Sequence, residues 1–153
     1  MTRLLGVDFG ERRIGLAVAD SASGSVRPLV TLQRRTPERD ALAIDRICDE
    51  QRIDEIVVGL PLNMDGSEGA QARLTREWAA TVGALVSRPV MWHDERLTSL
   101  VSEERLGRAS RGHAGGPPSP AARNARRARI DREAAAQILQ LELDSRSSDE
   151  RTL

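Results

Sequence analysis

Three acidic residues stand in apolar surroundings, where an unpartnered charge is unfavourable. Asp8 interrupts the apolar run LLGVDF, and Glu95 follows the apolar segment PVMWH. Asp131 lies in a segment with helical spacing, on the same face as Ala135 and Ile138. Burying an ionised carboxylate without a partner costs several kcal/mol, so each of these acids requires a group that balances its charge.

Each acid taken alone also has a structural explanation. Asp8 could pair with a buried arginine, Glu95 could lie beside Asp94 at the start of a helix, and Asp131 could interact with the N-terminus of its helix. One explanation accounts for all three, namely that the carboxylates converge on hard divalent cations. Oxygen ligands without paired histidines or cysteines favour Mg²⁺ or Mn²⁺ over zinc. Two such ions can activate a water molecule and stabilise the leaving oxygen in phosphodiester cleavage.

The elements that must position these acids follow from the hydrophobic pattern. Apolar runs predict strands at 4–9, 14–19, 26–32, 55–60 and 89–93. Helical spacing predicts helices at 37–52, 67–86, 98–106 and 128–143. The first two strands flank the turn GERR and are typical of a hairpin. Three meandering strands followed by β-α-β crossovers predict an α/β fold, a five-stranded mixed sheet with helices on both faces.

Local signals refine three of these elements. Pro28 favours an edge position for its strand, because proline has no N–H to donate to a neighbouring strand. Thr36 followed by Pro37 marks the start of a helix. Ser67 is expected to cap the helix at 67–86, and Asp65 followed by Gly66 is typical of a turn.

The composition is that of one soluble domain, which we expect over residues 1–144, followed by a polar, disordered tail at 145–153. The 153 residues are 39% apolar and 30% charged, and 23 basic residues balance 23 acidic ones. No apolar run approaches the roughly 18 residues of a membrane span. Cys48 is the only cysteine, which excludes an internal disulfide and a cysteine-based zinc site. We therefore expect a cytoplasmic protein without membrane contact.

Arginine is concentrated late in the chain. Between Arg105 and Arg132 there are eight arginines and a single acid, Asp131. Glycine and proline within 107–127 predict a flexible basic loop there, which is either a solvated surface segment or an arm that binds phosphate backbones. In the second interpretation the candidate nucleic-acid contacts also include the first hairpin, and they are Arg12, Arg13, Arg123, Arg126, Arg127 and Arg129.

Four segments in order resemble the YqgF family over roughly residues 3–144: GVDFGERRIGLAVAD, IVVGLPLNMDGSEG, HDERLTS and IDREAAAQILQLELD. Members of that family are described as Holliday-junction resolvases and pre-16S rRNA nucleases with an RNase H-like fold. The resemblance implies the strand order 3-2-1-4-5, with Asp8, Glu95 and Asp131 as metal-binding catalytic acids. Arg96, within the third motif, is a candidate contact to the cleaved strand. The segment after DERLTS is longer than is usual in the family, which affects the expected substrate shape.

The leading hypothesis is a two-metal-ion endonuclease that uses Mg²⁺ or Mn²⁺ and acts on structured or single-stranded RNA or on branched DNA. The resemblance favours processing of the 5′ end of pre-16S rRNA. The alternative is a Holliday-junction resolvase acting on DNA in recombination and repair, which should be a symmetric homodimer, whereas an RNA nuclease could be a monomer.

Two other classes of protein are less well supported. A non-catalytic nucleic-acid-binding module is a further alternative, but the presence of all three acids argues for an enzyme. GVDFG followed by a hairpin also resembles the phosphate-binding turn of sugar kinases. Those enzymes need two such domains, and 153 residues supply one.

Overall fold

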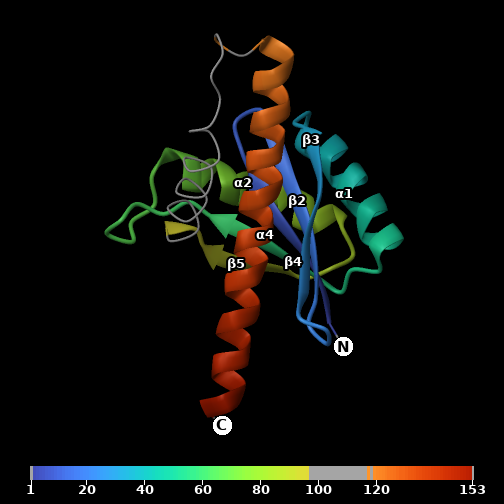
Figure 1. Ribbon diagram of the computed structural model, residues 1–153, viewed down its shortest axis with the longest axis vertical. Helices are drawn as coiled ribbons and strands as arrows, with labels where there is room; N and C mark the ends of the chain where they lie inside the picture. The colour runs from blue at the N-terminus through green and yellow to red at the C-terminus, as the bar shows by residue number, and fades with distance from the viewer. Residues whose placement is uncertain (1, 97–116, 118, 153) are drawn as a thin grey trace.

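A computed structural model describes residues 2–96, 117 and 119–152 of the chain (Figure 1). The strands are β1 (Arg3–Phe9), β2 (Arg13–Asp20), β3 (Ser25–Gln33), β4 (Glu55–Leu60) and β5 (Val90–Asp94). The helices are α1 (Pro37–Gln51), α2 (Ala70–Leu85) and α4 (Pro120–Thr152). The helix predicted at 98–106 and the loop residues 107–116 lie outside the described residues.

The five strands form one sheet in the order β3-β2-β1-β4-β5. The neighbours β1 and β2, and β2 and β3, are antiparallel, whereas β1 and β4, and β4 and β5, are parallel. The predicted mixed sheet, its strand order and its first hairpin are therefore confirmed. Pro28 lies in β3 at one edge of the sheet, next to an irregularity in the pairing of β2 with β3.

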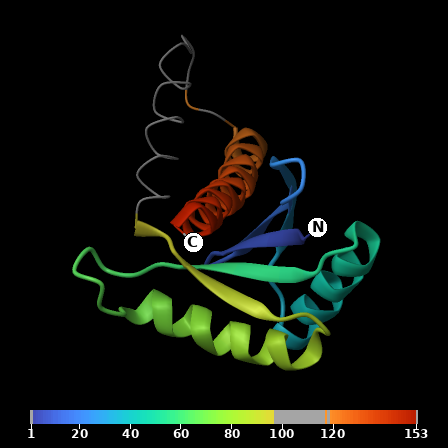
Figure 2. The ribbon, with the colours of Figure 1, turned by 90° about the horizontal axis from the view of Figure 1, so that it is seen from below.

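Helices cover both faces of the sheet, as predicted. Figure 2 shows α1 and α2 on one side and α4 on the other. The larger apolar core lies on the side of α1 and α2, where Ile44 and Trp78 pack against buried strand residues. The smaller core lies beneath α4, where Ile138 and Leu139 pack on Leu4 and on small residues of β2. Burial of one such aliphatic side chain contributes about 1.5–3 kcal/mol, so docking of α4 stabilises the fold substantially.

Helix α4 begins earlier than the sequence analysis predicted. Residues 120–127, which were expected to belong to a flexible loop, form its first turns. The Ser119 hydroxyl accepts a hydrogen bond from the Ala122 N–H at 3.1 Å, and Pro120 is the first helical residue. Proline is well tolerated there because its missing N–H would have had no partner within the helix. The Ser-Pro pair was thus a helix-start signal.

Helix α4 also ends later than predicted, because 145–152, expected as a disordered tail, is helical. Arg146 donates to Glu142, one turn earlier, at 3.0 Å and to Glu55 of β4 at 2.8 Å. The first contact supports the helix from within, and the second ties it to the sheet. These pairings explain how a polar segment continues the helix, so the predicted end at 143 was wrong.

The loop between β4 and α2 is stabilised by its own polar side chains. Ser67 donates to the Asp65 carboxylate at 2.6 Å and accepts from the Asn63 amide at 3.0 Å. Gly66 has a φ of +89°, which confirms the predicted turn. The prediction that Ser67 caps α2 was wrong. The helix begins after Gly69 and has no side-chain cap. Among the described residues, no helix is both long and apolar enough to cross a membrane.

Candidate active site

Two of the three predicted acids contact each other at the carboxyl ends of parallel strands. Asp8 lies near the end of β1, and Glu95 directly follows β5. Their side chains share a hydrogen bond. The backbone N–H of Glu95 donates to the Leu60 carbonyl of β4 at 3.1 Å, which holds the chain after β5 against the end of β4. Glu95 is only 7% exposed, so this contact lies inside the protein.

Gly59 in β4 provides the space that Glu95 occupies. A Cβ atom at this position would lie 2.6 Å from the carboxyl carbon of Glu95 and 2.5 Å from Cδ1 of Ile138. Any side chain here would therefore displace the carboxyl group of Glu95 and the end of the Ile138 side chain. The sequence holds only a weak signal for this role of Gly59, namely a glycine within the apolar strand EIVVGL.

Burial governs the protonation of the two acids. It raises the pKa of Glu95 far above the ordinary carboxyl range, and the neighbouring charge of Asp8 raises it further. Burial also raises the pKa of Asp8, although the hydrogen bond from Glu95 acts in the opposite direction. Because burial raises the pKa of both carboxyls, the pair as a whole favours keeping one proton, shared in the hydrogen bond between them.

Asp131 lies next to this pair but binds an arginine. Its Oδ2 atom is 2.9 Å from Nε of Arg13, and the two side chains are 20% and 17% exposed. Gly15, the cross-strand neighbour of Asp8, lies directly beneath the helix backbone at Asp131. The charge of Asp131 is close enough to contribute to the raised pKa of Asp8. The structure therefore brings the third acid beside the other two, with its carboxylate directed to Arg13.

The three acids do not yet form a complete set of ligands for a metal ion. Within the described part of the chain, no three histidine, cysteine, aspartate or glutamate side chains are close enough together to hold one ion. The available donors are the oxygens of Asp8 and Glu95. The oxygens of Asp131 would become available if its ion pair with Arg13 broke. Oxygen-only donors in this chemistry fit a hard divalent cation, which would replace the proton of the Asp8–Glu95 pair.

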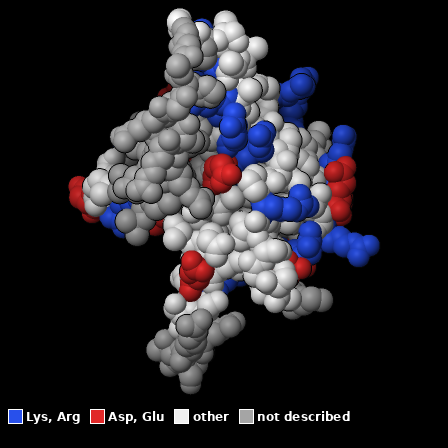
Figure 3. Space-filling view, viewed as in Figure 1, with Lys and Arg blue, Asp and Glu red and all other residues white. Residues whose placement is uncertain are grey.

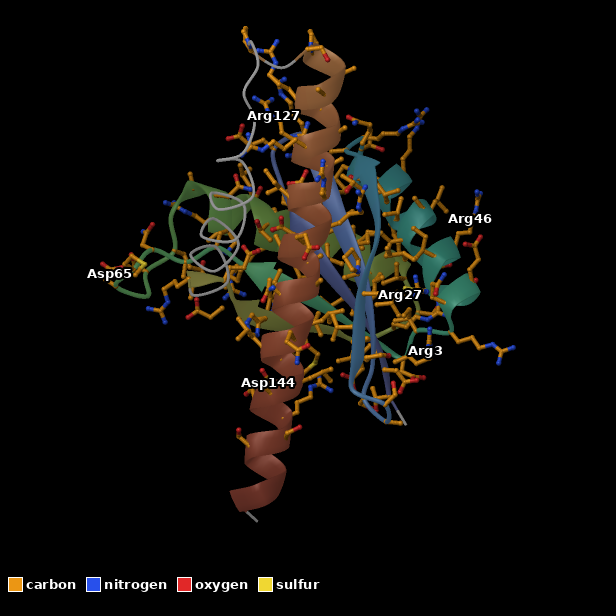
Figure 4. The ribbon with its side chains drawn as sticks, viewed as in Figure 1. Arg3, Arg27, Arg46, Asp65, Arg127 and Asp144 are labelled. Carbon is orange, nitrogen blue, oxygen red and sulfur yellow. The ribbon has the colours of Figure 1, made fainter. Side chains whose placement is uncertain are left out.

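An open cleft of about 600 Å³ borders Asp131. Figure 3 shows basic side chains gathered where the N-terminal half of α4 crosses the sheet. The residues that line the cleft come from the β1–β2 turn and from α4, and they are Gly10, Glu11, Arg12, Arg13, Arg127 and Asp131. Figure 4 shows Arg127 in the N-terminal half of α4. Three of the seven predicted nucleic-acid-binding arginines thus line one cavity.

The other predicted arginines lie elsewhere. Arg123 precedes Arg127 by one helical turn and extends the same side of α4. Arg126 and Arg129 are exposed on other sides of that helix and do not line the cleft. Arg96 donates to the Asp94 carboxylate at 2.8 Å and to the Met64 carbonyl at 3.1 Å, which places it in a separate hollow.

Arg34 helps to position the β1–β2 turn of the cleft, a role that was not predicted from the sequence. Its guanidinium donates to the Glu11 carbonyl at 3.0 Å and lies 4.4 Å from the centre of the Phe9 ring. These contacts fasten the turn that carries Arg12 and Arg13 to the end of β3. No sequence signal identifies Arg34, because the contact depends on how β3 pairs with the first hairpin.

Comparison with known proteins identifies the family of the chain. A family model described as RuvX, Holliday junction resolvase, matches residues 2–145. The chain belongs to the RuvX family. This is the YqgF family that the sequence motifs indicated, so that resemblance is confirmed.

Curated relatives of this RuvX chain match over nearly its whole length. A protein of Anaeromyxobacter dehalogenans strain 2CP-1 is 44% identical over 145 residues, which cover 95% of this chain and 98% of the relative. A protein of Chloroflexus aurantiacus is 39% identical over 146 residues, covering 95% and 89% of the two chains. Both carry the words "pre-16S rRNA nuclease" in their names.

Solved structures confirm the fold expected of a RuvX protein. Thermus thermophilus RuvC, in a complex with a Holliday junction substrate, superposes with a TM-score of 0.55 at 15% identity, covering 96% of each chain. The fowlpox virus Holliday junction resolvase gives a TM-score of 0.52 at 9% identity, covering 94% of this chain and 99% of that one. At these identities the likeness establishes the RNase H-like fold and nothing further.

Proposed function

We propose that this RuvX protein is a divalent-metal-dependent endonuclease that hydrolyses phosphodiester bonds in nucleic acid. The observation that carries the proposal is the buried Asp8–Glu95 pair beside Asp131, which is the acid that lines the arginine-rich cleft. The names of relatives that are 39–45% identical favour pre-16S rRNA as the substrate, and we propose its 5′ end as the place of cleavage. Such a nuclease would act in the cytoplasm and would not require a second copy of the chain.

The acids of the site supply the metal ligands. Asp8 and Glu95 would hold Mg²⁺ or Mn²⁺, and Asp131 would complete the ligand set. When bound in a two-metal arrangement, such ions lower the pKa of the attacking water and stabilise the leaving oxygen. Asp8 and Glu95 give up their shared proton on binding, and Gly59 leaves the space that keeps Glu95 directed toward Asp8.

The arginines hold the substrate. Arg12 of the hairpin turn and Arg127 of α4 both line the cleft, so both can contact the phosphates of a strand bound there. Contacts of this kind position the backbone and carry no sequence information. Cleavage is therefore expected to depend on the shape of the substrate and on salt concentration rather than on a base motif.

A Holliday-junction resolvase is the second candidate. It is favoured by the description of the matching family. A resolvase cuts two strands symmetrically and would require a homodimer of this chain. RNA cleavage and junction cleavage make opposite predictions about the preferred substrate, and only junction cleavage requires a dimer.

A cleavage assay distinguishes these functions. Wild type would be compared with Asp8→Asn and with the control Asp144→Asn, an exposed acid near the other end of α4 (Figure 4). The substrates are single-stranded RNA spanning a 16S precursor end, single-stranded DNA and a four-way junction, each with Mg²⁺, with Mn²⁺ and with EDTA. We expect metal-dependent cutting of the RNA by wild type and the control, and none by Asp8→Asn. Binding without cutting under every condition would refute the nuclease.

A further inference from the structure

The ion pair between Arg13 and Asp131 joins an arginine of the cleft to an acid of the site. The Nε–Oδ2 distance is 2.9 Å, and both side chains are largely buried. Arg12 and Arg127 line the same cleft, but neither forms an ion pair within the residues that the structure describes. Of these three arginines, Arg13 is thus the one whose guanidinium already has an anionic partner. The Asp131 carboxylate is in turn paired with Arg13 and is not free to bind a cation.

A carboxylate that is bound to a guanidinium is a weaker ligand for a cation. In a partly buried site the two positive charges compete for the same acid, because electrostatic interactions are stronger there than in bulk water. A cation held by Asp8 and Glu95 would lie close to Asp131, whose charge already acts on Asp8. Cation binding would therefore weaken the hold of Asp131 on Arg13.

We propose that Arg13 couples cation binding to nucleic-acid binding. When a divalent cation binds Asp131, the ion pair with Arg13 breaks. The released guanidinium then binds a substrate phosphate beside Arg12 and Arg127. This inference rests on the proposed function, since it takes nucleic acid as the ligand of the cleft. By linkage, nucleic acid that engages Arg13 raises the affinity for the cation by the same factor. Couplings of this kind typically change affinity by about 5- to 150-fold.

The experiment measures binding and needs no cleavage. Anisotropy of a labelled single-stranded RNA gives its Kd in EDTA and in Ca²⁺, a cation that also takes oxygen ligands. The variants are Arg13→Gln and the matched Arg12→Gln, which removes an equal charge from the same cleft. Arg12→Gln should weaken RNA binding by a similar factor in both solutions. Arg13→Gln should have little effect in EDTA and weaken binding about tenfold in Ca²⁺.

Two further measurements keep the test independent of one variant. Asp131→Asn frees Arg13 without a cation, so this variant should bind RNA in EDTA about as tightly as wild type does in Ca²⁺. In calorimetry without RNA, Arg13→Gln should bind Ca²⁺ several-fold more tightly than wild type, because the competitor for Asp131 is gone. Circular dichroism establishes that each variant is folded.

The outcomes separate this inference from the proposed function. Equal loss of RNA affinity in both solutions for Arg13→Gln, or an unchanged Ca²⁺ affinity, would overturn the coupling. A wild type that shows the coupling but never cuts nucleic acid would refute the nuclease and leave the coupling standing. A wild type that binds no nucleic acid under either condition would refute both.

Discussion

Gly15 of β2 lies in direct contact with the backbone of Asp131 in helix α4. A Cβ atom on Gly15 would lie 2.0 Å from the Asp131 carbonyl oxygen, closer than any side chain can approach. Gly15 is also the cross-strand neighbour of Asp8. The contact therefore sets how closely the acid of the helix approaches the acid of the central strand.

Gly15→Ala should consequently damage both stability and activity. The added methyl group meets backbone rather than a flexible side chain, so α4 must shift, and we expect a loss of about 2–4 kcal/mol in the free energy of unfolding. Gly83→Ala in α2 is the control, because its Cβ would meet only Val90 at 3.4 Å and alanine favours helix. Urea unfolding of both variants measures the difference. Equal stability of the two would show that α4 does not depend on this contact.

The raised pKa of Glu95 predicts how stability depends on pH in EDTA. In the folded protein this pKa is raised to about 10, so above the ordinary carboxyl pKa the unfolded chain loses this proton first. The folded state then binds more protons, and the Glu95 contribution to stability falls as pH rises from about 5 toward 10. Glu95→Gln removes that contribution. We expect it to stabilise the metal-free protein by about 1–3 kcal/mol near pH 9 and by less near pH 6.

Thermal and urea unfolding at several pH values in EDTA would measure this effect. Asp144→Asn serves as the control, since it removes an acidic side chain from an exposed position of α4. If the gain in stability from Glu95→Gln were the same at every pH, Glu95 would not be the group that retains a proton.

Metal binding should release protons. Carboxylates bind cations in their ionised form, and the Asp8–Glu95 pair holds a proton before the cation arrives. We expect about one proton released per protein when Mn²⁺ binds near pH 7.5. Calorimetry in two buffers with different enthalpies of ionisation counts these protons. Wild-type heats that are the same in both buffers would contradict the shared proton, and Glu95→Gln should release none from this pair.

The position of Arg127 predicts that it contributes more to RNA affinity than the neighbouring arginines of the helix do. Arg127 lines the cleft one helical turn before Asp131, whereas Arg129 lies on the opposite side of α4. Arg127→Gln should weaken RNA binding roughly fivefold and reduce the magnitude of its salt slope by about one. Arg129→Gln should have a smaller effect, and Arg46→Gln, on α1, none. Similar losses for all three would mean that net charge alone governs binding.

The sheet was predictable because its strands carry strong local signals. The continuous apolar run of β4 matched its predicted bounds at 55–60, and Thr36 with Pro37 marked the start of α1 correctly. Helix α4 was harder to delimit, because its ends are polar or arginine-rich. Those ends are held by Ser119 and by the pairing of Arg146 with Glu55, a contact between residues distant in the sequence.

The candidate site was predictable in its acids but not in its contacts. Asp8 and Glu95 stood out as charges in apolar settings, and the structure places them in hydrogen-bond contact. The pairing of Arg13 with Asp131 could not be inferred, because it depends on how closely α4 lies on β2. Gly15 and Gly59 were missed for the same reason. Their role is to lack a side chain where another part of the protein packs closely against the strand.

The order of the elements along the chain has a consequence for biosynthesis. Helix α4 follows all five strands, yet it supplies Asp131 and covers the apolar face that contains Leu4 and Val57. During translation that face stays uncovered until α4 has left the ribosome. A nascent chain therefore lacks one acid and one wall of the cleft, and the candidate site would be assembled only after the polypeptide has been made through this helix.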